Sequence, residues 1–118
     1  MQHQEKKTEA MIQAVYDLEK QYPGRLNIEV EDDLIRTTKI GSDVDPETQQ
    51  PLEPLQLEIE TDLSLLRLGK KADMAKPPTE GYIVVEFRSG DTVENEHHFH
   101  FKTVEEVIDY MKFKIAPN

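Results

Sequence analysis

The sequence predicts an α+β domain in which an antiparallel sheet of about five strands carries the N- and C-terminal helices packed on one face. Apolar residues recur at three- and four-residue steps near both ends of the chain, which is the spacing of amphipathic helices. Between those ends, apolar and polar residues alternate, which is the spacing of half-buried strands. The 118 residues fit a single domain, 1–118, in the order α-β-β-β-β-β-α.

The N-terminal third predicts one helix and two strands. An apolar stripe predicts a helix over residues 8–22, which Pro23-Gly24 ends. Strict alternation over 25–31 predicts a strand, and Asp32-Asp33 predicts a tight turn into a second strand over 34–40. The polar residues expected on the outer face of the first strand are Asn27, Glu29 and Glu31.

The middle of the chain predicts a long strand between two flexible loops. Prolines and a glycine predict an irregular loop near 41–54. Residues 55–65 alternate throughout, with Leu55, Leu57, Ile59, Thr61, Leu63 and Leu65 facing inward. The second loop, near 68–80, overlaps the basic stretch 67–78. That stretch has no interleaved aromatic residues, so it is a poor nucleic-acid footprint.

The C-terminal third predicts a hairpin followed by a helix. Strands over 82–88 and 92–101 are expected to flank a turn at Ser89-Gly90-Asp91. The apolar residues expected to share the inner face are Ile83, Val85, Phe87, Val93, Phe99 and Phe101. Thr103-Val104-Glu105-Glu106 is a capping box, in which Glu106 is expected to reach back to the N–H of the cap, and it predicts where the last helix begins.

The composition restricts the classes of function. A net charge of −10 disfavours direct binding to nucleic-acid phosphates or anionic membranes. No apolar run approaches the roughly 20 residues that span a bilayer. The absence of cysteine excludes disulfides, thiolate catalysis and Cys-type metal sites, and it is compatible with a cytoplasmic location. No serine elbow or phosphate-binding loop is present, so we name no catalytic residues and expect no enzyme.

The excess negative charge is local, and it gives the first functional hypothesis. Residues 41–66 contain seven acidic residues and no basic one, and several of them fall on every second position of a predicted strand. We therefore expect the sheet to have one apolar face and one acidic, solvent-exposed face. The protein would be a non-catalytic interaction module, of chaperone, inhibitor or immunity type, which binds a basic protein or other macromolecule through the acidic face or an edge strand. The predicted partner-binding residues are Glu58, Glu60, Asp62, Glu94 and Glu96.

A further expectation concerns assembly. Two open sheet edges without proline favour a homodimer, through an edge or through the helices.

The order of elements in this small acidic chain is similar in outline to that of type III secretion chaperones. This similarity rests on element order alone and has no motif to carry over, so it is an analogy of outline.

The alternative hypothesis is a metal-binding protein or small metalloenzyme. In the segment 94–100, alternation places His98 and His100 on the outer face, with Cβ atoms about 7 Å apart. Two such imidazoles can share a divalent metal ion with Glu94 or Glu96. The same pattern also fits a solvated structural face or a pH-sensitive partner contact. No other cofactor is predicted.

Overall fold

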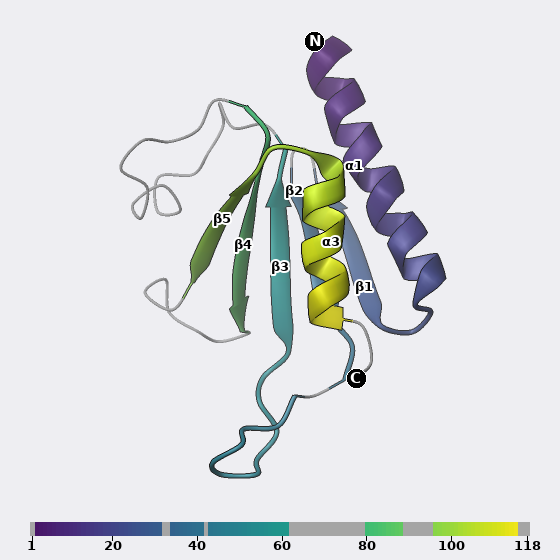
Figure 1. The fold of residues 1–118 in the computed structure, drawn as a ribbon. Helices are drawn as coiled ribbons and strands as arrows, with labels where there is room; N and C mark the ends of the chain where they lie inside the picture. Colours follow the sequence, from purple (N-terminus) through teal and green to yellow (C-terminus); the bar gives the residue numbers. More distant parts are fainter. Residues whose placement is uncertain (1, 32–33, 42, 62–79, 89–95, 116–118) are drawn as a thin grey trace.

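The predicted fold class is confirmed by the structure, a computed structural model. It describes residues 2–31, 34–41, 43–61, 80–88 and 96–115 (Figure 1). The strand predicted to reach residue 65, the basic connector and the turn at 89–91 lie wholly or partly outside these ranges. The elements are α1 (Gln2–Gln21), β1 (Leu26–Glu31), β2 (Leu34–Lys39), β3 (Leu55–Glu60), β4 (Tyr82–Arg88), β5 (His97–Phe101) and α3 (Val104–Ile115).

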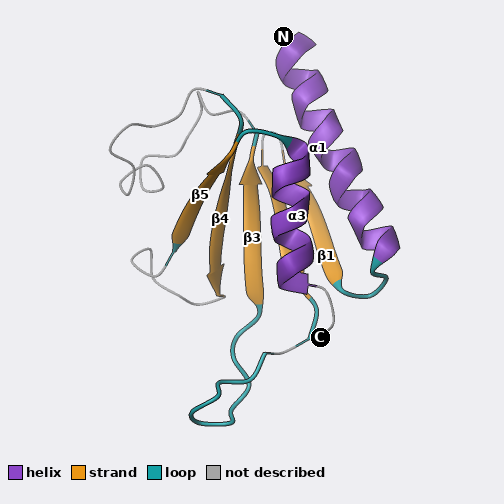
Figure 2. Cartoon of the chain, in the orientation of Figure 1, coloured by secondary structure: helices purple, strands orange, loops and turns teal. Residues whose placement is uncertain are grey.

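The strands form one antiparallel sheet in the order β1-β2-β3-β4-β5, so each described strand pairs with its sequence neighbour. Both helices cover the same face of this sheet and run in the same direction along it (Figures 1 and 2). The register aligns Ile35, Ile59, Val84 and Phe99 in one row across the sheet. Side chains in one such row share a face, so this row marks the face that the helices cover.

The main core lies between that face and the two helices. The amphipathic stripes predicted from the sequence supply it: Met11, Val15 and Leu18 from α1, and Val107, Met111 and Ile115 from α3, are buried. The buried Thr37 hydroxyl donates a hydrogen bond of 2.7 Å to the carbonyl of Leu57. None of the helices in the described ranges is long and apolar enough to cross a lipid bilayer.

The predicted cap of α3 is present, with one difference in its reciprocal contact. The Glu106 N–H donates to the Thr103 hydroxyl oxygen at 3.2 Å, as an N-cap requires. The Glu106 carboxylate accepts from the Thr103 hydroxyl at 3.3 Å. The sequence-based expectation was a bond from the Thr103 backbone N–H instead.

The segment expected to be an irregular loop near 41–54 contains a short hairpin that projects beyond the end of the sheet (Figure 1). Val44 and Pro51 form an antiparallel bridge, and the Asp45 N–H donates to the Gln50 carbonyl at 2.9 Å. The Asp45 carboxylate accepts the Glu47 N–H at 2.8 Å, and Gln49 adopts a left-handed φ of 62°. A local Asp turn therefore organises a segment whose proline content predicted an irregular, flexible loop.

The predicted orientation of β4 is wrong. Ile83 and Val85 lie on the face opposite the helices, and Phe87 packs with them. Tyr82 and Val84 belong to the main core instead, and they share their face with Phe99 and Phe101. Glu86 therefore faces α3 and not the outer side. The four residues of 82–85 are apolar in succession and all buried, so alternation could not show which of them face the helices.

Candidate functional site

The accessible acidic part of the outer sheet face lies on β1. Glu29 and Glu31 keep 64% and 53% of their side chains exposed. Arg36 on β2 lies between them and the sheet centre: its guanidinium is 3.2 Å from the Glu31 carboxylate and 3.9 Å from that of Glu29. The predicted outward placement of Asn27, Glu29 and Glu31 is confirmed by the register, because their rows alternate with the Val30–Ile35–Ile59 row on the face that the helices cover.

The expectation of a uniformly wet acidic face is wrong at β3. Glu58 and Glu60 are outward on β3, but they are only 6% and 5% exposed. The Nε of Arg36 donates to the Glu58 carboxylate at 2.8 Å, and this bond raises the pKa of Arg36. Ile83 and Val85, on the same face, are buried as well. Alternation had identified the side on which these carboxylates lie, but it carries no information about their access to solvent.

The other predicted partner-binding residues divide into two groups. Asp62 and Glu94 lie outside the described residues. Glu96 precedes β5, its side chain is 14% exposed, and its carboxylate is 3.3 Å from Nε2 of His98. Glu96 is therefore separated from the β3 carboxylates by the whole of β4, and the described members of the predicted set do not form one exposed patch.

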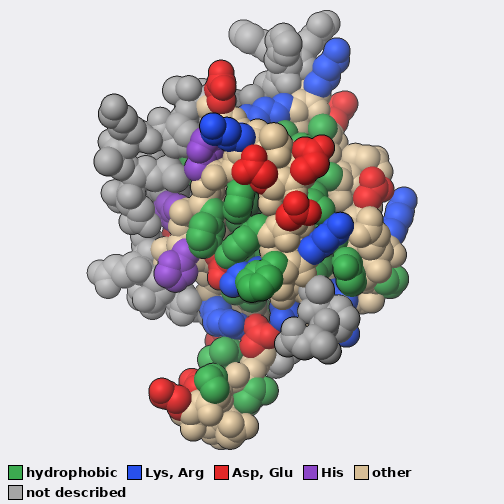
Figure 3. Space-filling model, in the orientation of Figure 1, with side chains coloured by type: hydrophobic (Ala, Val, Ile, Leu, Met, Phe, Trp, Pro, Cys, Tyr) green, Lys and Arg blue, Asp and Glu red, His purple; other side chains and the backbone are tan. Residues whose placement is uncertain are grey.

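Three of the four histidines, His97, His98 and His100, lie on β5 at the edge of the described sheet (Figure 3). Register places His98 and His100 on the outer face, as predicted. The His98 side chain is only 2% exposed, and its Nε2 is 3.3 Å from the Glu96 carboxylate. Nε2 of His100 is instead 2.5 Å from the carbonyl oxygen of Glu80. The two rings therefore contact different partners. Within the described ranges, no three His, Asp or Glu side chains gather in a way that could hold a metal ion.

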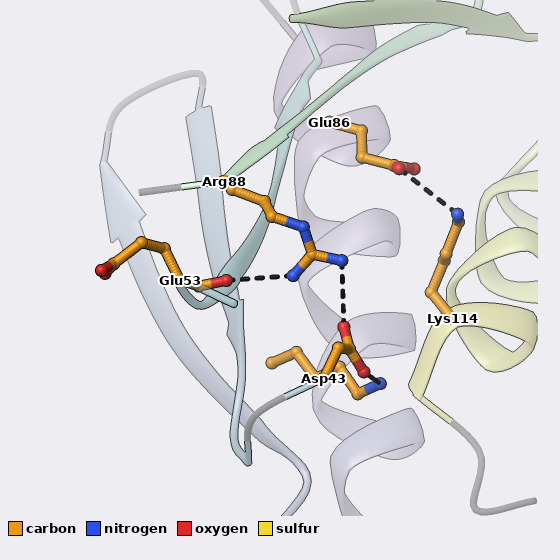
Figure 4. A network of polar contacts seen from close by, with 6 residues as sticks. Asp43, Glu53, Glu86, Arg88 and Lys114 are labelled. Carbon is orange, nitrogen blue, oxygen red and sulfur yellow. Dashed lines mark hydrogen bonds and ion pairs between the residues drawn. The ribbon is translucent and has the colours of Figure 1, made fainter. Parts of the chain in front are cut away.

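A network of charges at the base of the projecting hairpin was missed by the sequence reasoning (Figure 4). The Arg88 guanidinium lies 3.1 Å from the Asp43 carboxylate and donates to the Glu53 carbonyl at 3.0 Å. The Lys39 ammonium lies 2.8 Å from the other Asp43 oxygen. Hydrogen bonds from Lys39 and then from Arg88 lower the pKa of Asp43. The network ties the hairpin to β2 and β4, so we regard it as structural.

A second polar contact joins β4 to α3. The Tyr110 hydroxyl donates to the Glu86 carboxylate, and the Lys114 ammonium is 3.3 Å from the same carboxylate (Figure 4). Burial, followed by the bond to Glu86, raises the pKa of Tyr110. No local sequence signal predicts this contact, because it depends on the orientation of β4.

Comparisons with known proteins give no match. No family model matches the chain, and no curated protein and no solved structure is significantly similar to it. Any inference about function therefore rests on the chemistry and exposure of this chain's own residues.

Proposed function

We propose that this protein is a non-catalytic interaction module that binds a basic partner at the edge of the sheet formed by β1. The observation that carries the proposal is the exposure of Glu29 and Glu31 on a strand with one neighbour in the described sheet. An edge strand offers unpaired backbone N–H and C=O groups to an incoming strand. The two carboxylates would add attraction for lysine or arginine on that strand.

The charge balance around β1 favours a basic partner over a second copy. The exposed carboxylates of Glu29 and Glu31 both lie beside the guanidinium of Arg36, which also donates a hydrogen bond to Glu58. Antiparallel pairing of two β1 strands centred on Glu29 or Val30 would place a carboxylate opposite a carboxylate, which destabilises a sheet. A homodimer through β5 or through the helices is not opposed by these charges, and it stays a prediction.

The partner contacts proposed from the sequence change accordingly. Glu58 and Glu60 are buried, so we no longer assign them a direct contact with the partner; Glu58 supports the surface by accepting a hydrogen bond from Arg36. Glu29 and Glu31 replace them as the contact residues. A chaperone, an inhibitor and an immunity protein would each use such a surface. The absence of cysteine agrees with a cytoplasmic site of action, which we propose as well.

The test is affinity capture from native lysate at low salt, repeated at high salt, with wild type and a Glu29→Lys/Glu31→Lys variant. The proposal predicts that this variant binds the captured partner at least about tenfold more weakly than wild type does. The matched control is Glu47→Lys, an exposed acid on the projecting hairpin, which should bind as wild type does. Equal affinity for the double variant, with its fold intact by circular dichroism, would refute the role of β1.

Metal binding through His98 and His100 has less support, because the two imidazoles already engage Glu96 and the Glu80 carbonyl separately. Zinc, nickel or manganese that stays with the gently purified protein, and is lost in a His98→Ala/His100→Ala variant, would favour it over the interaction module. Metal-free protein whose melting temperature is unchanged by added metal would exclude it.

A further inference from the structure

A groove of about 280 Å³ lies between α1 and α3. Its lining residues fall on helical steps: Ala14, Asp17, Leu18 and Gln21 on α1, and Val104, Glu105, Ile108, Asp109 and Lys112 on α3. On each helix these residues cover about two turns, or roughly 11 Å of axis. The groove is therefore elongated along the helices. Its volume is also at or below the low end of the roughly 300–1,000 Å³ found for small-molecule pockets.

The groove has an apolar floor and an acidic rim on both sides. Ala14, Leu18, Val104 and Ile108 supply apolar surface, and Leu18 is also part of the main core. Asp17 is exposed on the α1 side.

On the α3 side of the groove, Glu105 and Asp109 are exposed, and Lys112 is the one cation in the lining. Neither Glu105 nor Asp109 has an ion pair with any residue in the described part of the chain. Acidic side chains also gather over α3 on this side of the molecule (Figure 3).

We propose that this groove binds an amphipathic helix of the basic partner. An elongated channel between two helices accepts the apolar stripe of a third helix, which is a common form of peptide recognition. Lysine or arginine on either side of that stripe would contact Asp17 on the α1 side of the groove and Glu105 and Asp109 on the α3 side. The inference rests on the proposed function, because it assigns a shape to the same basic partner.

The experiment uses a labelled synthetic helical peptide, in which a stripe of leucines is flanked on both sides by lysines. Fluorescence anisotropy measures its binding to the full chain. Ala14→Trp fills the groove without changing charge, and we expect it to weaken binding at least about tenfold. Ala10→Trp is the matched control, because Ala10 is exposed one turn earlier on α1 and does not line the groove. It should bind the peptide within about twofold of wild type.

A second variant keeps the test valid if Ala14→Trp disturbs the fold. Asp17→Lys/Asp109→Lys reverses one charge on the α1 side and one on the α3 side of the groove, both at exposed positions. It should abolish most of the salt-sensitive part of binding. Peptide affinity that is unchanged in both groove variants, or the absence of saturable binding to wild type at low salt, would overturn the inference.

The Glu29→Lys/Glu31→Lys variant separates this inference from the proposed function. If it weakens peptide binding while both groove variants bind as wild type does, the basic ligand uses β1. In that case the groove inference fails and the proposed function stands. If only the groove variants weaken binding, the groove inference stands, and the β1 contact is then judged by the lysate capture alone.

Discussion

Replacing Gly81 with alanine adds a single methyl group where β4 begins beside the end of β5. Gly81 has a left-handed φ of 92°, and a Cβ there would lie 2.4 Å from the carbonyl oxygen of Phe101 and 2.9 Å from Nε2 of His100. The imidazole could turn aside, but the carbonyl belongs to the backbone at the end of β5 and cannot move without shifting that strand. We therefore expect Gly81→Ala to be among the more damaging single substitutions in this chain.

The magnitude follows from two separate costs. A non-glycine residue in the left-handed region costs roughly 1–2 kcal/mol. Forcing an extra methyl group into a filled site costs typically about 1–3 kcal/mol more. The sum, about 2–5 kcal/mol, is a large part of the roughly 5–15 kcal/mol by which such domains are stable.

Gly24→Ala is the control, because Gly24 also has a left-handed φ, of 76°, but a Cβ there meets nothing within 4 Å. It should lose only the backbone cost. Urea unfolding followed by circular dichroism measures the free energy of unfolding of both variants. Losses that agree within about 0.5 kcal/mol would refute the reasoning, since the clash at the end of β5 would then be absent.

Two further predictions concern the charged groups. Arg36→Met should lower the free energy of unfolding, as measured by urea unfolding, by about 1–3 kcal/mol, because it removes the charged hydrogen bond to the buried Glu58. An Arg36→Met/Glu58→Gln variant should regain part of this loss, and no recovery would contradict the pairing. The fold lowers the pKa of Asp43, so its contribution is present above the ordinary aspartate pKa and is lost as pH falls below it. Asp43→Asn should therefore flatten the decline of melting temperature below about pH 4, and an unchanged decline would show that Asp43 does not contribute.

The helices and the sheet could be predicted because their signals are periodic and local. The apolar stripe containing Met11 and Val15 predicts α1, and the cap at Thr103 predicts where α3 begins. Alternation in β1 and β3 gave the correct face for each residue. The hairpin around Asp45 was missed because one side-chain turn outweighed the prolines near it.

The candidate site was predicted less well, because access to solvent depends on contacts distant in sequence. Glu58 alternates as an exposed residue does, yet its carboxylate is buried beside Arg36, which lies 22 residues earlier in the chain. Glu86 reaches α3 only because β4 presents the opposite face from the one expected. The α1–α3 groove needs both ends of the chain in place, so no local pattern could reveal it.

The pairing of every described strand with its sequence neighbour has a consequence for how the chain folds. Each strand pairs across a shorter stretch of chain than the one that separates α1 from α3, and contacts with smaller sequence separation tend to form earlier. The packing of α1 against α3 instead joins the two ends of the chain, so we expect it to form late. The groove would then exist only after folding is complete. A partner that binds there would distinguish finished molecules from partly folded ones, and its binding would slow the first step of their unfolding.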